Sequence, residues 1–196
     1  MIRGIASACA ILSAMSLTAA SGAAAQQSPK AQKPAKPAVH QAAAPSGDTQ
    51  PTLLGQYGEW GAYSASPSGS KVCFALAKPK VSKTEPVGRK RDQAYVFIST
   101  RPSENVKNEV SVIIGYPFKT SSDATAEIGS AKFAMYTQND GAWIKNVAEE
   151  ARMIDAMRKG AELVVKGVSG RGTSSTDQYS LKGLGEALAR VEQDCK

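Results

Sequence analysis

A segment rich in lysine and arginine has the clearest capacity in this sequence to bind another molecule. Between Lys78 and Asp92 it carries six basic and two acidic side chains, a net charge of +4. Guanidinium and ammonium groups donate charge-assisted hydrogen bonds to phosphate and carboxylate oxygens. We predict an anion-binding patch, and the alternative is a solvated loop between two strands, which most charge runs are. The predicted patch consists of Lys78, Lys80, Lys83, Arg89, Lys90 and Arg91.

A glycine-rich run is the second candidate for contact with an anion. Residues 166–173 read KGVSGRGT. This order differs from the G-x-x-x-x-G-K-[ST] of a phosphate-binding loop, and the residues that follow do not open a helix. We therefore expect a flexible loop between two strands, with Arg171 at its tip in a position to contact an anion.

Acid–base, nucleophilic and zinc chemistry find little support in the residue types. The single histidine, His40, precedes the predicted domain. Ser-His-Asp and Cys-His catalysis and the usual zinc ligand sets are therefore not expected. The carboxylates Asp123, Asp140 and Asp177 are scattered in the sequence, so whether two of them pair as in a glycosidase stays open at this point. We expect no metal and no cofactor.

Two cysteines are predicted to form a disulfide. Cys73 alternates with Val72 and Phe74 in a predicted strand, and Cys195 continues the apolar face of a C-terminal helix. The third cysteine, Cys9, lies in a predicted leader, and an exported chain meets an oxidising compartment. A Cys73–Cys195 bond would hold the helix on the strand. The alternative, a reactive thiol, lacks a C-x-x-C motif or a neighbouring histidine.

The 196 residues divide into a leader, a linker and a single domain. Residues 1–25 combine Arg3, an apolar stretch and a small-residue cleavage site, which predicts a signal peptide rather than a retained anchor. Residues 26–52 interleave lysine with proline and lack aromatics, which predicts a disordered Lys/Pro/Ala-rich linker. We interpret the linker as a spacer; the alternative is a basic tether to the cell wall or membrane. The domain, residues 53–196, carries a net charge of +4, equal to that of the basic segment.

The domain is predicted to be mainly β, an antiparallel β-sandwich-like fold with one mid-chain helix and one C-terminal helix. Short alternating runs separated by Gly, Pro, Asn and Ser are typical of such folds. The apolar run 112–114 indicates a central strand buried on both faces, and Gly129-Ser130 predicts a hairpin turn. Trp60 and Trp143 are interpreted as core or rim packing rather than ligand platforms. The predicted strands are 59–64, 71–77, 94–100, 109–115, 125–128, 132–136, 142–144, 163–168 and 178–181.

Local signals place the two helices. Asn146 and Glu149 form a capping box, and Gly160 ends the mid-chain helix. Glu149 and Glu150 are interpreted as capping charges rather than an acid–base pair, because adjacent helical residues diverge by about 100°. The predicted apolar stripes are Val147, Ala151, Ile154 and Met157 in the first helix, and Leu184, Leu188, Val191 and Cys195 in the second.

Several stretches of the domain resemble the invasion-associated locus B family of exported Gram-negative proteins. The resemblance implies a small β-rich periplasmic or surface-associated domain, linked in some members to host-cell invasion. It implies no catalytic mechanism and therefore no active-site residues. The stretches are Gly58-Glu59-Trp60, Val72-Cys73-Phe74-Ala75, residues 108–118, residues 133–143 and Ser180-Leu181-Lys182-Gly183-Leu184.

Together these features predict an exported, non-enzymatic protein of the cell envelope or surface. Its basic segment is expected to contact an anionic envelope component or an acidic protein surface. Nucleic acid is not expected, because the chain is exported and aromatics are not interleaved with the basic residues. The alternative is an envelope hydrolase with carboxylates that the sequence does not locate. We expect a periplasmic or outer-membrane-associated protein with no transmembrane segment after signal removal, and the oligomeric state is left open.

Overall fold

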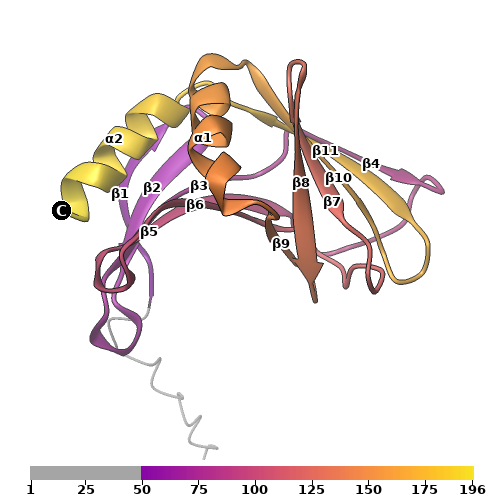
Figure 1. Ribbon diagram of the computed structural model, residues 1–196, viewed down its shortest axis with the longest axis horizontal. Coiled ribbons are helices and arrows are strands. Elements are labelled where there is room, and N and C mark those ends of the chain that lie inside the picture. The colour runs from indigo at the N-terminus through magenta and orange to yellow at the C-terminus, as the bar shows by residue number, and fades with distance from the viewer. Residues whose placement is uncertain (1–49) are drawn as a thin grey trace, which may run out of the picture. The chain divides into compact units, whose positions relative to one another are not determined.

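The computed structural model describes residues 50–196, which form one antiparallel sheet of eleven strands with two α-helices packed on it (Figure 1). The order across the sheet is β1-β2-β3-β5-β6-β9-β8-β7-β10-β11-β4. The strands are β1 Thr52–Tyr57, β2 Trp60–Ala65, β3 Val72–Ala77, β4 Val81–Glu85, β5 Tyr95–Arg101, β6 Val106–Ile113, β7 Ala124–Ile128, β8 Ala131–Gln138, β9 Gly141–Ile144, β10 Glu162–Val168 and β11 Ser174–Ser180. The helices are α1 Glu150–Lys159 and α2 Leu184–Asp194.

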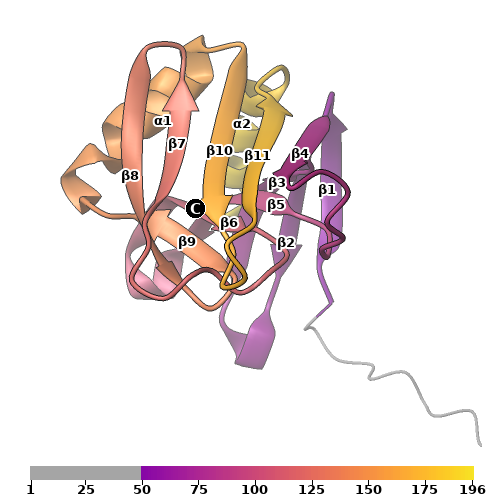
Figure 2. The same ribbon diagram turned by 90° about the vertical axis from the view of Figure 1, so that its right-hand side faces the viewer.

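The sheet curls so that its two halves face each other, which gives the sandwich-like form. Figure 2 shows β7, β8, β10 and β11 in front of β2, β5 and β6, with β9 leading from one layer to the other. The halves are in contact, because the Trp60 Nε1 on β2 donates a hydrogen bond of 2.9 Å to the Ser180 carbonyl on β11. Twist accumulates across a wide sheet and favours such curling. The predicted fold class is confirmed, with both layers belonging to one continuous sheet.

Alternation along the strands separates a buried face from a face directed outward. In β5, Val96, Ile98 and Thr100 are buried, while the residues between them are half-buried. In β6, the predicted central strand, Val112 is fully buried and Ile113 half-buried on the opposite face. A period of two places alternate side chains on opposite faces of a strand. The inward set from both halves therefore forms one continuous core.

The two edge strands were absent from the sequence prediction. β1 begins at Thr52, so it includes the last residue assigned to the linker. β4 lies inside the basic segment and pairs with β11, which corrects the interpretation of that segment as a loop. Its sequence VSKTE is mostly exposed and has no apolar alternation. An edge strand gains its hydrogen bonds from one partner, and that pairing leaves no local pattern in the sequence.

Only part of the leader and linker prediction falls on described residues. The signal peptide 1–25, Cys9 and His40 all lie outside residues 50–196, as does the linker up to residue 49. Among residues 50–196, neither helix has the length and apolarity required to span a bilayer.

Helix α2 packs as predicted, with Leu184, Leu188 and Val191 buried against β1, β2, β3 and β5. It starts at Gly183, whose φ is 91°. A Cβ at this position would lie 2.0 Å from the carbonyl oxygen of Tyr57, so a larger residue does not fit without movement of β1. The glycine thus permits the close approach of the β11–α2 connection to β1.

Helix α1 differs from its predicted stripe. Its buried residues are Met153, Ile154 and Met157, whereas Val147 is 74% exposed and Ala151 is exposed. A 3₁₀ turn, Val147–Glu149, directly precedes α1, so the rotation per residue before Glu150 is not that of an α-helix. The Asn146 side chain caps this turn by accepting a hydrogen bond from the Ala148 amide, at 3.2 Å.

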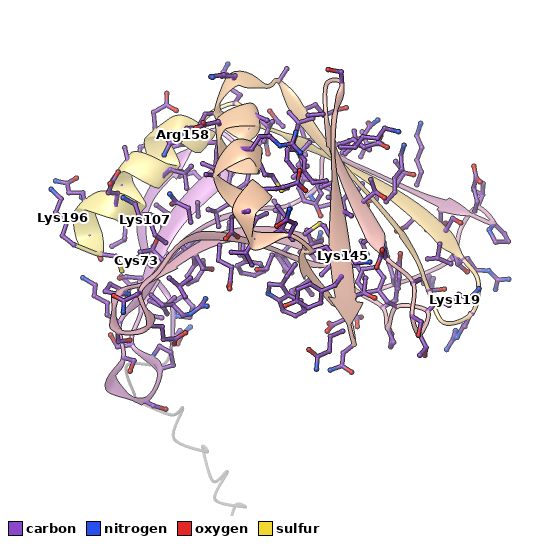
Figure 3. All side chains as sticks on the ribbon, in the orientation of Figure 1. Cys73, Lys107, Lys119, Lys145, Arg158 and Lys196 are labelled. Atoms are coloured by element: carbon purple, nitrogen blue, oxygen red, sulfur yellow. A yellow bond between two sulfur atoms is a disulfide. The ribbon has the colours of Figure 1, made fainter. Side chains whose placement is uncertain are left out.

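The predicted disulfide joins Cys73 to Cys195, whose Cα atoms are 5.9 Å apart. Cys73 is fully buried, on β3, and lies next to the C-terminal end of α2 (Figure 3). Beside the bond, the ammonium of Lys71 and the Asp194 carboxylate form an ion pair of 3.1 Å. The last turn of α2 is therefore attached to the sheet by a covalent bond and an exposed ion pair.

Candidate anion-binding cleft

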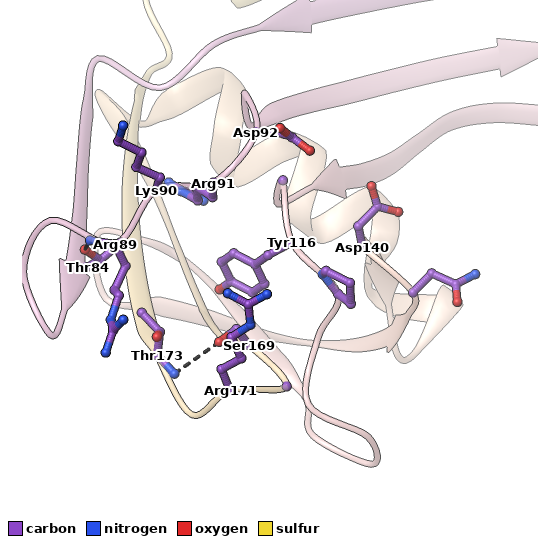
Figure 4. Close-up of a pocket in the computed structure, with 14 residues that line it drawn as sticks. Thr84, Arg89, Lys90, Arg91, Asp92, Tyr116, Asp140, Ser169, Arg171 and Thr173 are labelled. Carbon is purple, nitrogen blue, oxygen red and sulfur yellow. Dashed lines mark hydrogen bonds between the residues drawn. The ribbon is translucent and has the colours of Figure 1, made fainter.

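A cleft of about 720 Å³ opens at one end of the curled sheet (Figure 4). Residues from β4, from the β4–β5 loop and from three further connections line it. It falls in the size range typical of small-molecule sites. Its lining residues are Thr84, Arg89, Lys90, Arg91, Asp92, Gly115, Tyr116, Pro117, Asn139, Asp140, Ser169, Gly170, Arg171 and Thr173.

A buried ion pair holds the β4–β5 loop in place at the cleft. The Arg91 guanidinium contacts the carboxylate of Asp177 on β11, and the two side chains are 9% and 0% exposed. Arg91 also donates hydrogen bonds to the Ile114 carbonyl, at 2.7 Å, and to the Ser82 hydroxyl, at 3.2 Å. The Ser82 hydroxyl in turn donates to Asp177, at 2.8 Å. A buried charge needs both a partner of opposite sign and hydrogen bonds. The Arg91 guanidinium and the Asp177 Oδ1 have both, whereas the Asp177 Oδ2 is buried with no hydrogen-bond partner among residues 50–196.

Tyr116 forms part of the cleft wall. Its hydroxyl shares a hydrogen bond of 2.6 Å with the Ser175 hydroxyl, and its ring lies 5.8 Å from the Arg91 guanidinium carbon. Burial raises the pKa of the phenol above its ordinary value of 10, against a smaller lowering by the hydrogen bond to Ser175. The hydroxyl therefore stays protonated at neutral pH, and the ring offers an uncharged surface.

Three basic side chains line the cleft without an ion-pair partner among residues 50–196: Arg89, Lys90 and Arg171. The amide of Arg89 donates to the Thr84 hydroxyl, at 3.3 Å, so the loop folds back on β4. The β10–β11 turn brings Arg171 to the same place, because Ser174 of β11 pairs with Glu85 of β4. In this turn, the Ser169 hydroxyl accepts a hydrogen bond of 3.1 Å from the Thr173 amide.

Two carboxylates line the other side of the cleft. The Asp92 amide donates to the Gly115 carbonyl, at 2.9 Å, and the Ile114 amide donates to the Asp140 carbonyl, at 2.9 Å. Gly115 has φ 82°, and a Cβ there would lie 2.2 Å from the Asp92 carbonyl oxygen. Only glycine lets the two segments approach this closely. In the view of Figure 4, Asp92 and Asp140 lie on one side of Tyr116, and Arg89 and Lys90 on the other.

The predicted patch is divided by the fold. Arg89, Lys90 and Arg91 line the cleft, but Arg91 is engaged by Asp177. The other three, Lys78, Lys80 and Lys83, are exposed and are not among the lining residues. The Lys78 ammonium lies 5.7 Å from the centre of the Tyr95 ring. Lys80 donates its backbone amide to the Gln178 carbonyl, at 2.8 Å, and Lys83 pairs in register with Thr176.

Sequence analysis missed the polar and aromatic part of the lining. Thr84, Tyr116 and Asn139 carry no motif, and each lies in a different segment of the chain. Asp92 was counted only as a charge that reduces the net charge of the basic segment. The one available signal was that Tyr116-Pro117 directly follows a buried apolar run, which marks the end of a central strand.

The carboxylates considered for catalysis are not gathered into one site. Asp123 forms an exposed ion pair with Lys145, at 2.7 Å, and Asp177 is engaged by Arg91. Asp140 alone of the three lines the cleft. Among residues 50–196, no group of three or more His, Cys, Asp or Glu side chains has the arrangement of a metal site.

The two tryptophans occupy different environments. Trp60 is fully buried in the core and is hydrogen-bonded to Ser180. Trp143 is half-buried on the outward face of β9 and stacks on Tyr136 of β8, with ring centres 5.6 Å apart. Both therefore contribute packing, in the core and at the outer surface respectively.

The fold and cleft define a small disulfide-bonded β-domain with a charged cleft at the end of its sheet. The model of the Invasion associated locus B (IalB) protein family matches residues 60–192, which is most of the chain. The chain belongs to this family, which is exported and envelope-associated and is not known as an enzyme family. No curated protein and no solved structure matches this chain significantly.

Proposed function

We propose that this chain is an exported, non-enzymatic binding protein of the cell envelope, and that its cleft holds the anionic group of an envelope component. The leader predicted over residues 1–25 and the family's envelope association support export. We place the protein in the periplasm or at the outer membrane.

The observation that carries the proposal is the convergence of Arg89, Lys90 and Arg171 on one cleft. They come from two segments about eighty residues apart in the sequence, and the β4–β11 pairing brings them together. Guanidinium groups bind phosphate and carboxylate oxygens in a bidentate manner. The hydroxyls of Thr84 and Thr173 add neutral hydrogen-bonding groups to the same lining.

The structure offers a matched test of this proposal within the basic segment. The variant Arg89→Gln/Lys90→Gln/Arg171→Gln removes three positive charges from the cleft. The control Lys78→Gln/Lys80→Gln/Lys83→Gln removes three from residues outside its lining. We expect retention on phosphatidylglycerol vesicles at low salt to fall at least about tenfold in the cleft variant, because each basic residue near an anionic surface contributes about 1 kcal/mol. The control should lose clearly less. Co-sedimentation of the purified exported chain measures this.

Equal losses in the two variants would show that binding follows net charge and would overturn the cleft as the site. Unchanged retention in the cleft variant would overturn the proposal itself. Thermal unfolding of both variants serves as the check on folding. The three carboxylates considered for a hydrolase do not form a pair in the described residues, since Asp177 and Asp123 are engaged in ion pairs and Asp140 alone of the three lines the cleft.

A further inference from the structure

Charges of both signs face the cleft, and the fold sorts them into two groups. The basic group is Arg89, Lys90 and Arg171, and the acidic group is Asp92 and Asp140. Within residues 50–196, no ion pair joins the basic group to the acidic group. A site for a simple anion gains nothing from two carboxylates in its lining, because each repels the ligand. The carboxylates therefore require a separate explanation.

The backbone holds Arg89 and the acidic group on different sides of the cleft. Arg89 is held near β4 by the hydrogen bond of its amide to Thr84. Asp92 and Asp140 are both held at the end of β6, through Gly115 and Ile114 respectively. Tyr116 lies between the two sides in the view of Figure 4. This arrangement provides a basic side with Arg89 and Lys90, an acidic side with Asp92 and Asp140, and Arg171 beside the Tyr116 ring in the same view.

We propose that the cleft recognises a zwitterionic group in which a phosphate and an ammonium are separated by a short spacer, as in phosphoethanolamine. This inference rests on the proposed function, since the phosphate would occupy the anion site formed by the basic group. The ammonium would donate charge-assisted hydrogen bonds to Asp92 and Asp140. The spacer would lie along the uncharged Tyr116 ring.

The test compares O-phosphoethanolamine with ethyl phosphate, which has the same phosphate and carbon spacer but no ammonium. Titration calorimetry of the purified full chain at low salt gives a Kd for each compound. We expect phosphoethanolamine to bind about fivefold more tightly, the ratio that one partly exposed ion pair supplies. Equal affinities in the unmodified chain would overturn the inference.

Two isosteric or near-isosteric variants separate this inference from the proposed function. Asp92→Asn/Asp140→Asn should abolish the preference for phosphoethanolamine while ethyl phosphate binds equally well or better. Arg89→Gln/Arg171→Gln should weaken both compounds. Suppose that Arg89→Gln/Arg171→Gln abolishes binding while Asp92→Asn/Asp140→Asn keeps the preference for phosphoethanolamine. This result would support the anion site and overturn the proposal that the acidic group binds the ammonium. Failure of the unmodified chain to bind either compound would overturn both.

Vesicles identify the source of the group. Retention on phosphatidylethanolamine vesicles in addition to binding of the soluble compound would support a lipid headgroup as the ligand. Binding of the soluble compound without retention would support a free or glycan-borne phosphoethanolamine. Both outcomes support recognition of a phosphate and an ammonium by the cleft. If Asp92→Asn/Asp140→Asn weakens vesicle retention or binding of the soluble compound, that measurement depends on the acidic group.

Discussion

Arg91 shows how a charged side chain acquires a structural role in this domain. From its place in the basic segment it was expected to bind an external anion, yet it points inward to Asp177, which is fully buried. Its bonds to Ile114 and Ser82 then connect the β4–β5 loop to β6 and β4. The charge of Arg91 is therefore compensated within the protein, and Arg89 and Lys90 are the basic side chains of the segment that line the cleft without an ion-pair partner among residues 50–196.

Removal of the Asp177 charge should destabilise the domain strongly. Asp177→Asn leaves the Arg91 guanidinium buried without its counter-charge, which typically costs about 3–5 kcal/mol. Asp123→Asn provides the matched control, since it breaks the exposed pair with Lys145 and should cost less than about 1 kcal/mol. Urea unfolding of both variants measures the difference. Similar values for the two variants would contradict the structural role of the buried pair.

Glu150 is a second residue whose environment departs from the sequence interpretation. It was assigned to the helix N-terminus as a capping charge, but its carboxylate accepts a hydrogen bond of 2.8 Å from the Val110 amide on β6. Burial raises its pKa above the ordinary value of 4.5, and the bond from Val110 lowers it by less. Glu149 instead pairs with Arg152, so the two adjacent glutamates do face different partners.

Glu150 and Glu127 should contribute to the pH dependence of the free energy of unfolding with opposite signs. A raised pKa means that the folded state binds more protons than the unfolded state at pH values just above 4.5, so the free energy of unfolding falls as pH rises through that window. Glu150→Gln should remove this decline. Glu127, whose pKa is lowered chiefly by the hydrogen bond from Lys166, provides the contrast. Its contribution is lost as pH falls below the ordinary value, and Glu127→Gln should remove that loss. Urea titrations at several pH values would contradict the assignment if both variants changed the profile in the same sense.

At the scale of the elements, the C-terminal helix is the one most completely predictable from local pattern. The spacing of Leu184, Leu188, Val191 and Cys195 defines one face, and all four are buried. The strand pattern predicts Cys73 on the face of β3 opposite Val72 and Phe74, and Cys73 is buried. The edge strand β4 was not predictable in this way, because its exposed polar residues form a strand only through pairing with β11. The other edge strand, β1, reads TLLGQY and lacks a strict alternation of apolar and polar residues.

The disulfide should contribute substantially to the stability of the domain. Cys73→Ala/Cys195→Ala should lower the free energy of unfolding by about 2–4 kcal/mol, the usual range for a bond that closes a long loop. The sequence separation of the two cysteines is 122 residues. Lys71→Gln, which removes only the adjacent exposed pair with Asp194, should cost less than about 1 kcal/mol. A double variant as stable as the unmodified chain in urea would show that packing alone holds α2 in place.

At the scale of the whole molecule, the charges that give the domain its net charge of +4 are unevenly distributed. Part of the surface charge is compensated in exposed ion pairs, such as Lys145 with Asp123 and Lys166 with Glu127. The cleft brings together five charged side chains that form no ion pair within residues 50–196. The location of charge, rather than its sum, distinguishes the site.

The family, the mainly antiparallel β class, the two helices and the disulfide partners were all readable from the residues, because each depends on short-range patterns. Alternation, helical spacing and capping act over a few positions, and a pair of cysteines leaves a single combination. The cleft was not readable, since its lining comes from segments between Thr84 and Thr173 that meet through the β4–β11 pairing and the end of β6. Long-range strand pairing also determined that Arg91 pairs with the buried Asp177, while Arg89, Lys90 and Arg171 line the cleft without an ion-pair partner among residues 50–196. The physical reason is that a side chain's charge is a property of its residue type, whereas its burial and its partners are properties of the folded chain.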